Sequence, residues 1–210
     1  DDVVLGDRQA GLAREVEPED LERVEDRRDR LGAVGIDEAG YGPTLGPLVV
    51  SAAAIRVPDE IQDREGPLPD FWKLLRQAVD RTPQTSRIPV SASKNLYKPG
   101  KGLATLEEGV LPFLVLRDGK LPTDLRALLK TLVRTRNALS YLESYPWYRE
   151  RNRPLPTASL KNYLMTLSGR LKEILDSKGM QFLGIVSMPV EVLQFNEILS
   201  SQQNKSMVPF

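Results

Sequence analysis

The chain has 210 residues, and its 29 lysines and arginines balance its 29 aspartates and glutamates, so the formal net charge is zero. It contains no cysteine and no histidine, which excludes disulfides, a thiol nucleophile, imidazole acid–base chemistry and zinc held by sulfur or imidazole. No apolar run reaches the length of a membrane span, so we expect a soluble, cytoplasmic protein without a membrane partner.

Residues 1–31 are rich in charged side chains and poor in apolar ones. A helix can begin at Pro18, because proline suits a first helical turn and the acids that follow it favour the positive end of a helix. The apolar stripe of that helix is thin. We therefore predict that residues 1–31 are a charged extension outside the core and that residues 32–210 form the globular domain.

Two apolar runs, Ala33 to Ile36 and Leu45 to Ile55, flank the acidic pair Asp37 and Glu38 and a glycine-rich turn. This pattern predicts a strand, the acidic pair, a tight turn and a second strand. Successive side chains of a strand point to opposite faces, so both carboxylates reach solvent only where the pairing ends. One interpretation is a solvated pair at a strand end. The other is a pair that holds a divalent cation through oxygen ligands.

The stretch around this pair reads Gly35-Ile36-Asp37-Glu38-Ala39-Gly40-Tyr41-Gly42-Pro43, followed by Gly46-Pro47 and an apolar strand. It resembles the first motif of type 2 ribonucleases H, the ribonuclease HII/HIII family. The resemblance implies an α/β, ribonuclease H-like fold with a mixed central sheet and helices on both faces. It also implies that Asp37 and Glu38 are catalytic ligands of Mg²⁺ or Mn²⁺, and that Gly40, Tyr41 and Gly42 contact the substrate. Tyr41 stands where the family has Arg or Lys, so substrate preference can differ.

A helix is predicted over residues 70–80 and a short strand over Ile88 to Val90. The loop that follows contains Ser93-Lys94-x-Leu96, which resembles the Asp-Ser-Lys-x-Leu segment of the same family, with Ala92 in place of the aspartate. The resemblance implies that Ser93 and Lys94 hold the substrate backbone, and a hydroxyl and an ammonium group can bind phosphate oxygens. The alternative is an ordinary surface loop.

The second half of the chain is predicted to alternate helices with one buried strand. The expected elements are a helix over 103–116 broken or kinked at Pro112, a helix over 124–142, a helix from Thr157 or Ser159 to Gly179, a strand over 180–187 and a helix over 189–199. The region 118–156 is expected to be a helical insert, whose aromatic stretch 141–148 either stacks on bases or packs into the core. The predicted core comprises Val34, Ile36, Leu48, Val50, Ile88, Leu164, Leu171, Leu183 and Ile185.

A ribonuclease H site gathers about four carboxylates around two metal ions. Only Asp37 and Glu38 have that family context here, so we expect a C-terminally truncated chain or the first part of a longer one. The expected function is metal-dependent hydrolysis of the RNA strand of an RNA/DNA hybrid. The main alternative is a non-catalytic ribonuclease H-like module that binds nucleic acid or protein. A general phosphotransfer domain has less support, because no P-loop or dinucleotide fingerprint is present.

Overall fold

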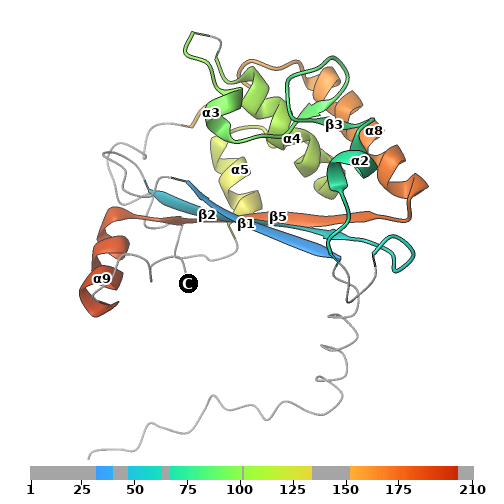
Figure 1. Cartoon of the computed structure of the whole chain (residues 1–210). Helices are drawn as coiled ribbons and strands as arrows, with labels where there is room; N and C mark the ends of the chain where they lie inside the picture. Colours follow the sequence, from blue (N-terminus) through green and yellow to red (C-terminus); the bar gives the residue numbers. More distant parts are fainter. Residues whose placement is uncertain (1–31, 40–46, 63–66, 101, 134–151, 203–210) are drawn as a thin grey trace, which may run out of the picture.

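The computed structural model describes residues 32–39, 47–62, 67–100, 102–133 and 152–202, whose helices and strands are drawn in Figure 1. Several predicted features lie outside these ranges: the extension 1–31, the turn residues Gly40, Tyr41 and Gly42, and the aromatic stretch 141–148.

Three strands form the central sheet: β1 (Ala33–Ala39), β2 (Leu48–Arg56) and β5 (Gln181–Val190), in the order β1-β2-β5. The antiparallel pairing of β1 with β2 confirms the predicted first hairpin. The β2–β5 pair is also antiparallel, so the expectation of a mixed sheet is wrong for the described strands. Parallel pairing occurs only in a separate two-stranded sheet within the described residues, between β3 (Val79–Asp80) and β4 (Ile88–Pro89).

A layer of helices lies on one side of the sheet, and α9 (Val192–Gln202) lies on the other side at one end (Figure 1). The layer consists of α2 (Phe71–Leu75), α3 (Ser93–Leu96), α4 (Ala104–Asp118), α5 (Leu125–Leu132) and α8 (Lys161–Ser177). Ile185 of β5 packs against a core formed by Leu111, Leu114 and Leu164. On the opposite face, Phe195 of α9 packs against Leu48. The described fold is therefore α/β, with a small antiparallel sheet between a thick helix layer and a single helix.

The helix α8 forms where its leucines recur at steps of three and four residues. Leu164, Leu167, Leu171 and Leu175 are each at most 3% exposed, so one stripe of the helix is buried. Gly179 has a φ of 64°, the left-handed conformation that glycine adopts readily just after a helix. The predicted helix is thus confirmed, although it begins at Lys161 rather than at Thr157 or Ser159.

Five predicted elements differ from the structure. The helix expected over 189–199 begins only at Val192, because Pro189 and Val190 continue the strand β5. The helix α4 continues through Pro112, which is fully buried, so the predicted break is wrong. The helix over 70–80 ends at Leu75, because the chain turns there to pair β3 with β4. The predicted loop at Ser93 is the short helix α3. Helix α5 ends at Leu132 rather than near residue 142, because Val133 is extended.

Two predicted core residues of β1 are exposed. Val34 is 52% exposed and Ile36 is 71% exposed, although Leu48, Ile88, Leu164 and Leu171 of the same prediction are buried. The physical reason is the position of β1: it is at the edge of the sheet that the described strands form, and the helices pack mainly against β5, which lies two strands away. The remaining predicted core residues, Val50, Leu183 and Ile185, are half-buried.

Candidate functional site

The acidic pair of the motif lies within β1, close to its C-terminal end. Asp37 is the cross-strand partner of Ser51, and Glu38 is the partner of Val50. Because strand side chains alternate, the two carboxylates project from opposite faces of the sheet. Both side chains are exposed. The strand therefore does not end at Ile36, and the two solvated carboxylates near the end of β1 do not converge on one point from the same face.

Asp37 belongs to a row of polar side chains that crosses all three strands. Its partner Ser51 is in turn the partner of Ser187 in β5, and the two serine hydroxyl oxygens are hydrogen-bonded at 2.9 Å. This row lies on the same face as Ile185, which is the face toward the helix layer. Cross-strand partners have Cβ atoms about 5 Å apart, so the Ser51 hydroxyl is within reach of the Asp37 carboxylate.

The face of β1 around Asp37 is open. A Cβ atom placed on Gly35, which precedes Asp37 on the same face, would meet no atom within 4 Å. The side chain of Ala33 further along that face is also small. The residues that precede Asp37 on the same face of β1 are therefore small. The helices of the layer pack mainly against β5 rather than against this part of β1.

Glu38 lies in an apolar row on the other face. Its neighbours across the sheet are Val50 and then Met188, which is 42% exposed. Phe195 of α9 packs near this row, against the cluster that includes Val50. Apart from Glu38 this row has no charged group, so the two carboxylates of the motif have different surroundings: a hydroxyl group beside Asp37 and apolar side chains beside Glu38.

Ser93 and Lys94 lie in the first turn of α3, and both are exposed. The N-cap position is Ala92, which supplies no side-chain hydrogen bond to the helix. An aspartate there would accept one from a backbone N–H, which is a physical role for the family residue that this chain lacks. The principal neighbour of α3 is α4. The strand that carries Asp37 is not among the main contacts of α3, so the two predicted motifs lie on different elements without packing together.

Two buried carboxylates that the sequence did not single out have shifted pKa values. Burial raises the pKa of Glu107, but hydrogen bonds from Thr157, Ala158 and Ser159 outweigh it, and the pKa lies below its usual value. Glu191, at the junction of β5 and α9, is 2% exposed, and burial raises its pKa even though the backbone N–H of Val192 lowers it. Spacing could not reveal either residue, because each depends on a tertiary contact.

The donor set around the acidic pair fits one carboxylate ligand of a metal ion, not a centre for two ions. Asp37 has open space and one neighbouring hydroxyl group, that of Ser51, whereas Glu38 projects from the opposite face. Across the described ranges, no group of three or more Asp, Glu, His or Cys side chains converges. A two-ion centre would need carboxylates in addition to those that the described residues bring together.

No protein-family model, no curated protein and no solved structure matches this chain. None of the helices in the described ranges has both the length and the apolar character that a membrane crossing requires.

Proposed function

We propose that this chain is a ribonuclease H-like domain that hydrolyses the RNA strand of RNA/DNA hybrids with Mg²⁺ or Mn²⁺. The observation that carries the proposal is the position of Asp37: an exposed carboxylate on an open face, in the first strand of a hairpin whose sequence resembles the first motif of type 2 ribonucleases H.

In this proposal Asp37 is the catalytic metal ligand, and Ser93 and Lys94 hold phosphate. Glu38, which the motif would also make a ligand, projects from the opposite face of β1 and does not share an ion with Asp37. Gly40, Tyr41 and Gly42, which lie outside the described residues, contact the substrate near the cut. When bound, Mg²⁺ or Mn²⁺ activates the attacking water and stabilises the leaving oxygen. Asp37 is the better placed of the two carboxylates, because it has a hydroxyl neighbour, Ser51, and an open face.

A second candidate function is a ribonuclease H-like module that binds nucleic acid or protein without cleaving it. The opposite orientation of Asp37 and Glu38 favours this candidate, because an ion held by one carboxylate alone binds weakly. The absence of a third converging acid among the described residues points the same way. The two candidates differ in one measurable property, which is turnover.

The test is cleavage of end-labelled duplexes of RNA/DNA, RNA/RNA and DNA/DNA with Mg²⁺, with Mn²⁺ and with EDTA. We expect cuts in the RNA strand of the hybrid alone, and only with metal. Hybrid binding without cleavage in either metal would support the non-catalytic module. Absence of both binding and cleavage would refute both candidates.

A further inference from the structure

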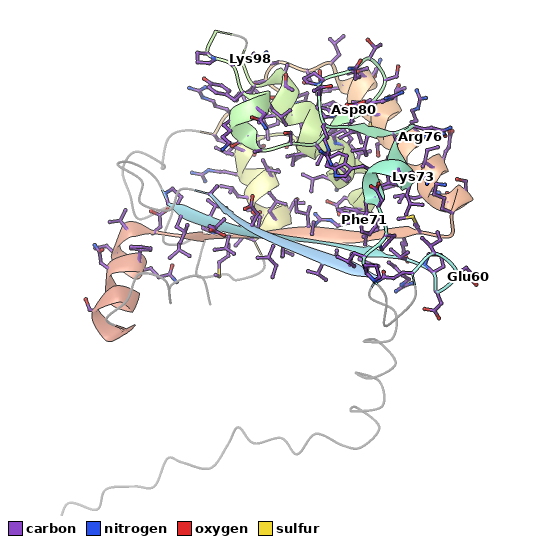
Figure 2. All side chains as sticks on the ribbon, viewed as in Figure 1. Glu60, Phe71, Lys73, Arg76, Asp80 and Lys98 are labelled. Atoms are coloured by element: carbon purple, nitrogen blue, oxygen red, sulfur yellow. The ribbon has the colours of Figure 1, made fainter. Side chains whose placement is uncertain are left out.

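A basic patch lies on the outer side of α2, away from the acidic pair. Trp72, Lys73 and Arg76 are exposed and lie at helical spacings that place them on neighbouring positions of one face. The guanidinium carbon of Arg81 lies 4.7 Å from the centre of the Trp72 ring. Figure 2 shows Lys73 and Arg76 next to each other at the outer end of the helix layer. We call these four residues the α2 patch.

The three cations of the α2 patch differ from the arginines that hold the fold together. Arg87 pairs with Asp80 at 2.8 Å, and Arg117 pairs with Asp118 and donates to two backbone carbonyls. Within the described ranges, no ion pair joins a cation of the α2 patch to a carboxylate. The nearby Asp70 accepts hydrogen bonds from backbone N–H groups at the start of α2. The positive charge of the patch is therefore not neutralised by the described residues.

The stacking of Arg81 on Trp72 orders a group that can bind phosphate. A guanidinium group over an aromatic face is held by cation–π attraction, which leaves its N–H edge unoccupied. No hydrogen bond from the Arg81 side chain to another described residue is formed, in contrast to Arg117. A planar fork of N–H donors that is already oriented matches two phosphate oxygens and loses little entropy on binding.

The α2 patch lies toward the end of the sheet where β1 begins. Phe71 and Leu74 of α2 pack with Ile55 into one cluster, and Ile55 is the cross-strand partner of Ala33, the first residue of β1. Asp37 is four residues further along β1, so Ala33 and Asp37 lie roughly 13 Å apart along the strand. The α2 patch therefore lies beyond the end of β1 that is remote from Asp37.

We propose that the α2 patch binds the phosphodiester backbone of the nucleic acid, at a position other than the one that Asp37 addresses. The inference rests on the proposed function, because it takes the substrate to be a nucleic acid. It adds a second binding surface that the motif residues do not include. The chemistry of the patch supports it: three unneutralised cations suit a repeated phosphate charge, and the exposed tryptophan adds an aromatic surface for a sugar or base.

The test measures anisotropy of a labelled 18-base-pair RNA/DNA hybrid against salt concentration, in EDTA so that no cleavage occurs. The variant carries Lys73→Gln, Arg76→Gln and Arg81→Gln together. We expect its affinity at low salt to fall at least tenfold and the slope of log K against log salt to fall by roughly 2 to 3.

The control removes the same charge elsewhere, with Lys120→Gln, Lys161→Gln and Arg170→Gln, three exposed positions outside the α2 patch. Its affinity should change less than threefold. A direct readout is the fluorescence of Trp72 in a Trp147→Phe background, since the chain has two tryptophans. We expect the hybrid to change that fluorescence. Melting curves for both triple variants verify that they are folded.

The results separate this inference from the proposed hydrolysis. Cleavage by the wild-type chain, with equal hybrid affinity in the patch and control variants, would overturn the α2 patch and leave the proposed function standing. Patch-dependent binding without cleavage would support the patch and overturn the hydrolysis. Equal affinity for the hybrid and for polyglutamate would overturn the inference, since the patch would then be a general polyanion surface.

Discussion

The carboxylate of Glu107 should stabilise the fold more than any exposed charge, because it accepts four hydrogen bonds from one segment. It accepts from the backbone N–H and the hydroxyl of Thr157 at 2.5 and 2.6 Å, from the N–H of Ala158 at 3.0 Å and from the N–H of Ser159 at 2.8 Å. The side chain is 7% exposed. It therefore fixes the segment before α8 to the first turns of α4.

The expected cost of Glu107→Ala is about 3 kcal/mol. A hydrogen bond to a charged group contributes roughly 1.5–3 kcal/mol, and a buried donor left without a partner costs about 1–3 kcal/mol. The contributions of the four hydrogen bonds do not add in full, because Thr157 and Ala158 are exposed and water can replace part of the lost hydrogen bonding. Glu107→Gln should cost about 2 kcal/mol, because its amide NH₂ would face backbone donors. In a domain of this size, 3 kcal/mol lowers the melting temperature by roughly 6–12 °C.

The pH dependence has a definite sign. The pKa of Glu107 lies below its usual value in the folded protein, so its contribution is complete above the unfolded pKa of about 4.3 and is lost as pH falls through the folded pKa. The melting temperatures of wild type and Glu107→Gln should differ equally at pH 7 and pH 5.5, and should converge as the pH falls from about 4.3 through the lower folded pKa of Glu107.

Glu108→Gln is the matched control, because it is the same substitution one position later. Burial, and then the charge of Glu107, raises the pKa of Glu108, so the folded state disfavours the charged form of Glu108. Its substitution should leave the melting temperature at pH 7 unchanged or slightly raised. The reasoning would be refuted if Glu107→Gln and Glu108→Gln melted within 1 °C of each other at pH 7.

Three further predictions concern packing and the edge of the sheet. Gly109→Ala should lower stability by about 1–3 kcal/mol, because its Cβ would lie 2.8 Å from the carbonyl oxygen of Pro89. Gly169 also lies within a helix but has open space around it, so Gly169→Ala should raise stability by up to about 1 kcal/mol. Chemical denaturation of both variants measures the two effects. Equal effects of Gly109→Ala and Gly169→Ala would contradict the prediction. Arg117→Gln should cost about 2–3 kcal/mol of stability in the same assay. The reason is that the guanidinium group donates to the carbonyl oxygen of Ile185 in β5 at 2.8 Å and pairs with Asp118. A loss of less than about 0.5 kcal/mol would show that these contacts do not stabilise the fold.

The local elements of the chain could be predicted where periodicity is strong. The β1–β2 hairpin and the leucine stripe of α8 follow from alternation and from steps of three and four residues, and both are confirmed. The prediction that Ile36 is buried in the core is wrong, and the reason lies in tertiary structure rather than in local pattern. An apolar residue in a strand indicates a buried face, but which strand is at the edge depends on where β5 and the helices pack, and that is decided by contacts between residues far apart in sequence.

The candidate site could be predicted only in part, for a related reason. The hairpin sequence identifies Asp37, and a correct register would have identified Ser51 as its partner. Ser187 could not be identified, because it is 136 positions from Ser51 and joins it only when β5 pairs with β2. The opposite orientation of Asp37 and Glu38 follows from β1 continuing to Ala39, whereas the sequence left open that the strand ends at Ile36.

The most direct test of the proposed function is the rate of hybrid cleavage by Asp37→Asn, measured at a hybrid concentration that saturates binding. Asp176→Asn, the same substitution at an exposed position of α8, is the control. We predict that Asp37→Asn loses at least about a hundredfold in cleavage rate, because several kcal/mol of metal-assisted stabilisation depend on its carboxylate. The control should keep the wild-type rate. Metal-dependent cleavage that persists unchanged in Asp37→Asn would contradict the account.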